Sequence, residues 1–99
     1  MTTTNAPDVP VPAGFWADVW QNSFPLSHRV LLGEVRAIDG VDVCVQASAV
    51  QFSDGRIDDG SVYERPHVHL GDDTLTAMQA RELAALLIEA ADELDRLNA

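Results

Sequence analysis

The feature that most constrains the fold is a long amphipathic run at the end of the chain, residues 76–99. Apolar side chains recur in it at alternating spacings of three and four, the period of one helical face. These residues are Ala80, Leu83, Leu87, Ala90, Leu94 and Leu97. Neither Gly nor Pro interrupts the run, and Thr76 and Gln79 have the spacing of a capping box. We therefore expect one helix from Thr76 onward, with one face packed on the rest of the protein.

The region before this helix has the spacing of β-strands. In residues 41–49 every second residue is Val or Ala, which predicts a strand with one buried face. Asp39 and Gly40 form a pair that hairpin turns favour, so we expect residues 28–38 to form the preceding strand. The phase changes at residues 50–52, which predicts a bulge or the end of the strand.

A third strand is expected over residues 62–70. Pro66 interrupts it and cannot donate a ladder hydrogen bond, which places the strand at an edge or breaks it there. The expected fold is α+β: a three-stranded antiparallel β-meander with a long C-terminal amphipathic α-helix packed on one face. Residues 15–99 form a single domain in this prediction. Residues 1–14 are rich in Thr and Pro without apolar periodicity, and are expected to be a flexible N-terminal tail.

Both tryptophans lie in one short aromatic segment. Phe15, Trp16, Val19 and Trp20 have helical spacing, so a short helix is the preferred interpretation, with an extended arm as the alternative. Burial in the protein's own core is the simplest role for these side chains. The functional alternative is a partner-binding surface, because Trp is enriched at the energetic centres of interfaces.

The length of the C-terminal helix predicts a homodimer. At about 1.5 Å per residue the helix is longer than about 30 Å, more than a three-stranded sheet covers. Leu94 and Leu97, near its end, would then present an apolar edge to a second copy.

Charge excludes several classes of partner. The chain has sixteen Asp and Glu, six Arg and no Lys, a formal net charge of −10. Such a surface repels nucleic-acid phosphates and anionic membranes, so neither is expected as a partner. An acidic nucleic-acid mimic that binds a basic protein remains an alternative. The N-terminus has no signal-peptide pattern and no apolar run reaches transmembrane length, which predicts a cytoplasmic protein.

His67 and His69 are the strongest candidates for chemistry. Residues two apart on a strand point to the same side, so both rings can face one metal ion. His28, Cys44, Asp72 or Asp73 are the candidates for further ligands. The simpler interpretation is a pair of surface histidines on an edge strand, with one ring bonded to a nearby carboxylate.

Other candidate sites fail on their spacing. The acidic loop 54–60 does not match a calcium-binding loop, because Arg56 and Arg65 occupy ligand positions. Cys44, the only cysteine, lies in an apolar strand without the positive setting of a nucleophile. No phosphate-binding Gly-rich loop or Ser-His-Asp pattern is present. We therefore expect a non-enzyme without a cofactor.

The helix also supports a resemblance. The segment from Leu75 to Ala84, LTAMQARELA, continues through Leu87 to Glu93 after a Val-rich region with an Asp54-Gly55 turn. Over about the last 60 residues it resembles small uncharacterised proteins of actinobacteria, particularly mycobacteria and their phages. The resemblance implies a small sheet crossed by one helix, and no activity or cofactor.

These observations favour a non-catalytic interaction protein that self-associates and binds another protein. The expected contact residues are Phe15, Trp16, Val19 and Trp20, with Leu94 and Leu97 in the dimer seam. A domain that binds a metal or small ligand through His67 and His69 is the alternative.

Overall fold

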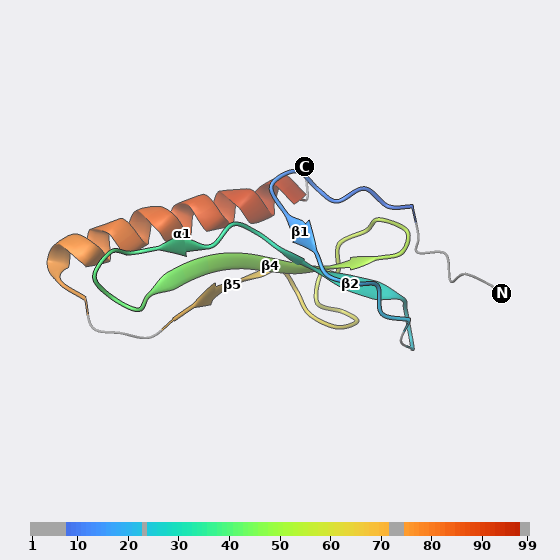
Figure 1. Cartoon of the computed structure of the whole chain (residues 1–99). Helices are drawn as coiled ribbons and strands as arrows, with labels where there is room; N and C mark the ends of the chain where they lie inside the picture. Colours follow the sequence, from blue (N-terminus) through green and yellow to red (C-terminus); the bar gives the residue numbers. More distant parts are fainter. Residues whose placement is uncertain (1–7, 23, 72–74, 98–99) are drawn as a thin grey trace.

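The computed structural model describes residues 8–22, 24–71 and 75–97. Within them the chain forms five strands and one helix. In chain order these are β1 (Trp16–Ala17), β2 (His28–Leu32), β3 (Arg36–Ala37), β4 (Cys44–Phe52), β5 (His67–Leu70) and α1 (Ala77–Leu97). All pairings in the sheet are antiparallel, and α1 lies along one face (Figure 1). The α+β class with a packed C-terminal helix is confirmed, and the sheet is larger than the expected three-stranded meander.

The central strand is β4, which pairs with β2 and β3 along one edge and with β5 along the other. Leu32 pairs with Ser48, whereas Arg36 pairs with Val45. Three residues, 33–35, therefore face two, 46–47, which is a β-bulge. The single strand expected over residues 28–38 is split at this bulge.

Gly33 lies in the bulge and leaves room for a side chain of α1. A Cβ atom on Gly33 would meet the carboxylate of Glu93, which α1 places against the sheet. Glu93 is buried and accepts a hydrogen bond from Arg36 Nη1 at 3.3 Å. The bulge thus lies where a charged pair joins the sheet to the helix.

The hairpin between β3 and β4 is confirmed, with Gly40 at a φ of +84° in its turn. The turn is longer than the two residues that Asp39 and Gly40 predict, because Ile38 N donates to Val43 O at 3.1 Å and β4 begins at Cys44 and not at Val41.

Of the two features predicted at residues 50–52, the end of the strand is confirmed, because β4 ends at Phe52. The bulge is not found, because residues 50–52 pair in regular register with β2. Val50, Gln51 and Phe52 are all buried, so the loss of alternation reflects a strand end that is covered on both faces. β5 begins directly after Pro66 and pairs only with β4, as expected for an edge strand.

The aromatic segment is extended and not helical. Trp16 pairs with Leu32 and Ala17 with Leu31, which makes β1 an edge strand of the sheet. The preferred short helix is therefore wrong. Alternation along β1 places Phe15 and Ala17 against the core and Trp16 on the other face. The hydrogen-bonded pairing of β1 with β2 stabilises the extended form, whereas the helical spacing covers only a few residues.

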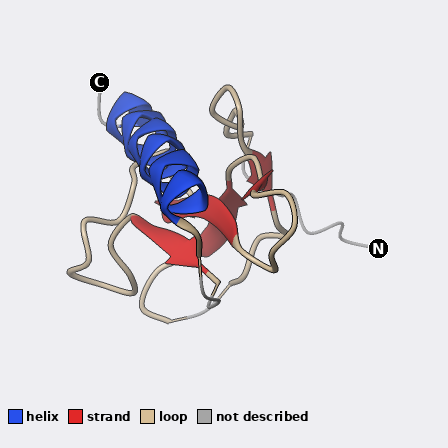
Figure 2. Cartoon of the chain, turned by 90° about the vertical axis from the view of Figure 1, so that its left-hand side faces the viewer, coloured by secondary structure: helices blue, strands red, loops and turns tan. Residues whose placement is uncertain are grey.

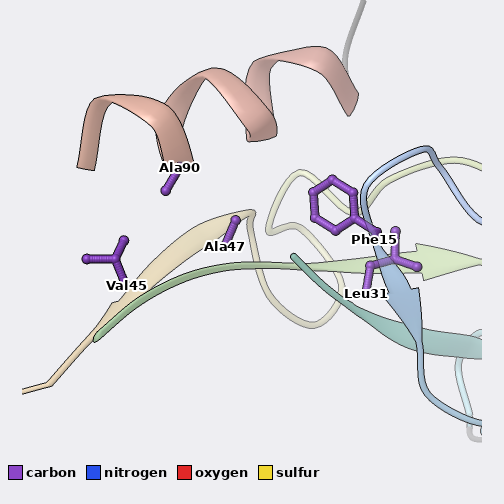
Figure 3. Packing of buried hydrophobic residues seen from close by; sticks show 5 residues of the cluster. All are labelled: Phe15, Leu31, Val45, Ala47 and Ala90. Carbon is purple, nitrogen blue, oxygen red and sulfur yellow. The ribbon is translucent and has the colours of Figure 1, made fainter. Parts of the chain in front are cut away.

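The helix begins as its sequence predicts. Thr76 N donates to Gln79 Oε1 at 2.9 Å, and Gln79 N donates to Thr76 Oγ1 at 3.1 Å, so the capping box is confirmed. Figure 2 shows α1 along one side of the sheet. Its buried Ala90 points toward Val45 and Ala47 of β4, with Phe15 and Leu31 farther along the same core (Figure 3).

The end of α1 does not overhang the sheet as the dimer prediction requires. Leu94 and Leu97 are half-buried and pack against the core cluster of their own chain. The larger exposed apolar side chains of the helix are instead Met78 and Ile88. The end of α1 is covered because β1 extends the sheet and brings Phe15 into the core below it (Figures 1 and 3). The sequence analysis did not place β1 in the sheet.

Candidate functional site

The sheet face away from α1 is the candidate functional surface, and we call it the open face. Strand register places four residues in one row across it, because directly paired residues share a face. Trp16 pairs with Leu32, Leu32 with Ser48, and Ser48 with His67. The row therefore runs from the exposed Trp16 on the edge strand β1 to His67 on the edge strand β5.

The aromatic segment is divided between core and surface. Phe15 is only 8% exposed and packs in the core, so it is not available to a partner. Trp20 lies under the guanidinium group of Arg29, whose Cζ atom is 4.4 Å from the ring centre. Trp16 and Val19 are 64% and 74% exposed. Of the four predicted contact residues, these two form the accessible part.

Arg29 is a buried organising residue that the sequence analysis missed. Its Nε donates to Gln51 Oε1 at 2.9 Å, and its Nη2 donates to the carbonyl oxygens of Val9 and Pro10 at 2.9 and 3.3 Å. Burial lowers the pKa of Arg29 from its ordinary value. The chain near Val9 is thus joined to the sheet, whereas residues 1–7 of the expected tail lie outside the described residues. The one sign of this role in the sequence is an Arg next to the apolar residues 30–32 of an expected strand.

Asp58 organises the loop of residues 58–64, which covers one end of the open face. It is 1% exposed, and its two carboxylate oxygens accept backbone N–H groups from four residues. The donors are Gly60, Val62, Tyr63 and Glu64, at 2.9, 3.4, 2.6 and 2.8 Å. Burial alone raises the pKa of Asp58, but these four donors outweigh it and the pKa lies below its ordinary value. The sequence analysis interpreted residues 54–60 as turns, and Asp58 followed by Gly60 was the only local signal of this role.

The loop held by Asp58 packs on the sheet through Tyr63. The ring of Tyr63 lies 4.0 Å from that of His28, and its hydroxyl donates to Leu26 O at 2.7 Å. This loop, drawn in yellow, lies on the side of β4 away from α1 (Figure 1). Tyr63 contacts both His28 and Phe52, so the loop covers the end of the open face where these two residues pair.

The predicted histidine pair is brought together on the open face. His67 Nε2 and His69 Nε2 are 3.1 Å apart, and their rings meet edge to face. Glu64 Oε1 lies 2.9 Å from His67 Nε2, so a carboxylate stands beside the pair as the simpler interpretation expected.

The proposed further ligands do not join this pair. His28 contacts Tyr63 under the loop, Cys44 is exposed, and Asp72 and Asp73 lie outside the described residues. Within residues 8–22, 24–71 and 75–97, no three His, Cys, Asp or Glu side chains are placed to hold a metal ion together.

Neither a membrane-spanning helix nor a similar known protein is found for this chain, within the limits of the described residues for the first. In the described part of the chain, no helix has the length and apolar character needed to cross a bilayer. The chain matches no protein-family model, no curated protein and no solved structure.

Proposed function

We propose that the protein is a non-catalytic interaction protein that self-associates through β1, with Trp16 as its main contact. The observation that carries this proposal is the 64% exposure of a Trp on a strand that is already paired in the sheet. Because the backbone of Trp16 is ordered before binding, its contacts cost less conformational entropy than those of a mobile arm. Val19, three residues further, is a second exposed apolar side chain in the same segment.

A second copy is the partner that we propose. β1 is an edge strand, and the free edge of such a strand can pair with another chain. A two-fold contact uses the same patch on both copies, so one exposed edge and one Trp supply both halves of the interface. A chain of 99 residues also gains stability from association more readily than a large domain does.

The net charge of −10 makes this proposal testable by salt. Two acidic copies repel each other, and salt screens that repulsion, so self-association strengthens as ionic strength rises. Binding of a basic partner would respond in the opposite way, because salt screens an attraction. Salt dependence therefore separates self-association from the alternative of an acidic mimic.

The test is sedimentation equilibrium of the untagged full chain at several protein concentrations, in low and high salt. We expect a dimer that is stronger in high salt, and a dissociation constant raised about 30-fold or more in Trp16→Ala. Ile88→Ala is the matched control, because Ile88 is also apolar and 63% exposed but lies on α1. A folded Trp16→Ala protein that dimerises as the wild type does would show the assignment to be wrong, as would a wild type that is monomeric throughout.

A further inference from the structure

The histidine pair has a geometry that the proposed self-association does not use. β5 places His67 and His69 on the same face, opposite Ser48 and Gln46 of β4. The two Nε2 atoms converge to 3.1 Å. Two nitrogens that each lie about 2.0–2.1 Å from one ion are about 2.9–3.4 Å apart for right-angled to tetrahedral coordination. The observed separation falls within that range.

The hydrogen bonds of His67 determine which nitrogen carries its proton. Nδ1 lies 2.9 Å from the carbonyl oxygen of Arg65, which can only accept, so Nδ1 is the donor. In the neutral ring Nε2 then carries a lone pair. A backbone carbonyl that fixes the other ring nitrogen in this way is the usual second partner of a metal-binding His.

A carboxylate and the second imidazole ring both face Nε2 of His67. Glu64 Oε1, 2.9 Å away, is also an acceptor when it is ionised. A metal ion held by the two rings therefore lies next to a negative charge.

We propose that His67 and His69 chelate a transition-metal ion of the Ni²⁺, Cu²⁺ or Zn²⁺ type through their Nε2 atoms. Imidazole nitrogen suits these ions, whereas Mg²⁺ and Ca²⁺ prefer oxygen ligands. The negative charge of Glu64 beside His67 favours the cation. The described residues do not enclose the ion, so water or donors from another molecule fill its remaining positions.

Isothermal titration of the untagged full chain with Zn²⁺ and with Ni²⁺ tests this proposal. We expect saturable binding of one ion per chain, or of one ion per two chains if a second copy supplies the other donors. The affinity falls at least about 10-fold in His69→Ala and in His67→Gln. It also falls at acid pH, because protonated imidazoles do not bind metal.

Two controls separate this site from the acidic surface. Mg²⁺ measures weak binding to carboxylates in general, and Asp59→Asn removes an exposed carboxylate of the neighbouring loop without touching either ring. Because His69 is exposed, His69→Ala is expected to fold, and circular dichroism checks that it does. A folded His69→Ala protein that binds Zn²⁺ and Ni²⁺ as tightly as the wild type would overturn the proposal, and so would a wild type that binds neither ion more tightly than Mg²⁺. If one ion binds per chain, Trp16→Ala should retain metal binding, so the metal test can succeed where the self-association test fails.

Discussion

The two faces of the sheet differ in what holds them and in what they leave exposed. On the helix face, Leu31, Val45 and Ala47 are fully buried and form one core cluster with Ala90 of α1. On the open face, a loop held by one buried carboxylate covers one end, while Trp16 and His69 remain exposed at the two edge strands. The helix face thus consists of small and apolar side chains that stabilise the fold by burial. The open face carries Trp16 and His69, whose exposed side chains contribute little to that burial. That difference is our reason for placing both proposed binding functions on the open face.

The largest loss of stability is expected on the helix face, from Leu31→Ala. Leu31 is fully buried in the core cluster, so truncation removes apolar burial and leaves a cavity. We expect the free energy of unfolding to fall by about 3–5 kcal/mol, measured by urea denaturation followed by circular dichroism. Leu70→Ala is the matched control, because Leu70 lies on the same face but is half exposed, and it should cost about 1 kcal/mol or less. Equal losses in the two variants would contradict the location of the core.

A smaller loss is expected on the open face, from Asp58→Ala. The substitution leaves four backbone N–H groups without their carboxylate acceptor, and only partial hydration can replace it. We expect a loss of about 2–3 kcal/mol by the same urea titration. Asp59→Ala removes the neighbouring exposed carboxylate, which accepts from Ser61 N, and should change the stability by less than about 0.5 kcal/mol. If the two variants were equally stable, Asp58 would not organise the loop.

The same carboxylate predicts how stability changes with pH. The pKa of Asp58 is lower in the folded chain than in the unfolded chain, so the ionised group contributes stability above the unfolded value of about 3.9. That contribution is lost as the pH falls from about 4 through the folded pKa. Asp58→Asn should therefore be less stable than the wild type at pH 7, and the difference should shrink toward pH 3 in parallel urea titrations. A difference that stays constant over this range would show that the ionised form is not what stabilises the loop.

The smallest of these effects is expected at the start of α1, from Thr76→Ala. The substitution removes the hydroxyl that accepts the Gln79 N–H and should cost about 1 kcal/mol. Thr76→Ser keeps the acceptor and should restore most of the loss. Thermal unfolding of the three proteins measures both differences, and a Ser variant as unstable as the Ala variant would contradict a capping role.

Local sequence patterns predicted the parts of this fold that depend on neighbours in the chain. The capping box of Thr76 and Gln79 and the alternation predicted over residues 41–49 need only residues a few positions apart. The capping box is found in the structure, and the alternation of buried with less buried residues is found over residues 43–47. The class of the fold followed from these two patterns. The paired histidines followed from the two-residue period of a strand.

The remaining features depend on contacts that are distant in sequence. The extended form of Trp16 depends on Leu32, and the bulge at Gly33 depends on Glu93, 60 residues later in the numbering. Arg29 and Asp58 resembled ordinary charged residues because their backbone partners are set by the folded loops. The dimer seam at Leu94 and Leu97 was predicted for a sheet without β1, which is why that prediction placed the exposed apolar surface on the helix.

Native mass spectrometry of the untagged protein, compared with Trp16→Ala at the same concentration and in volatile buffer of raised ionic strength, is the most direct test of the open face as a binding surface. We predict a dimer for the wild type and mainly monomer for Trp16→Ala, with Ile88→Ala behaving as the wild type does. A dimer that survives Trp16→Ala unchanged, or a wild type found only as monomer, would contradict the proposal that the exposed tryptophan joins two copies.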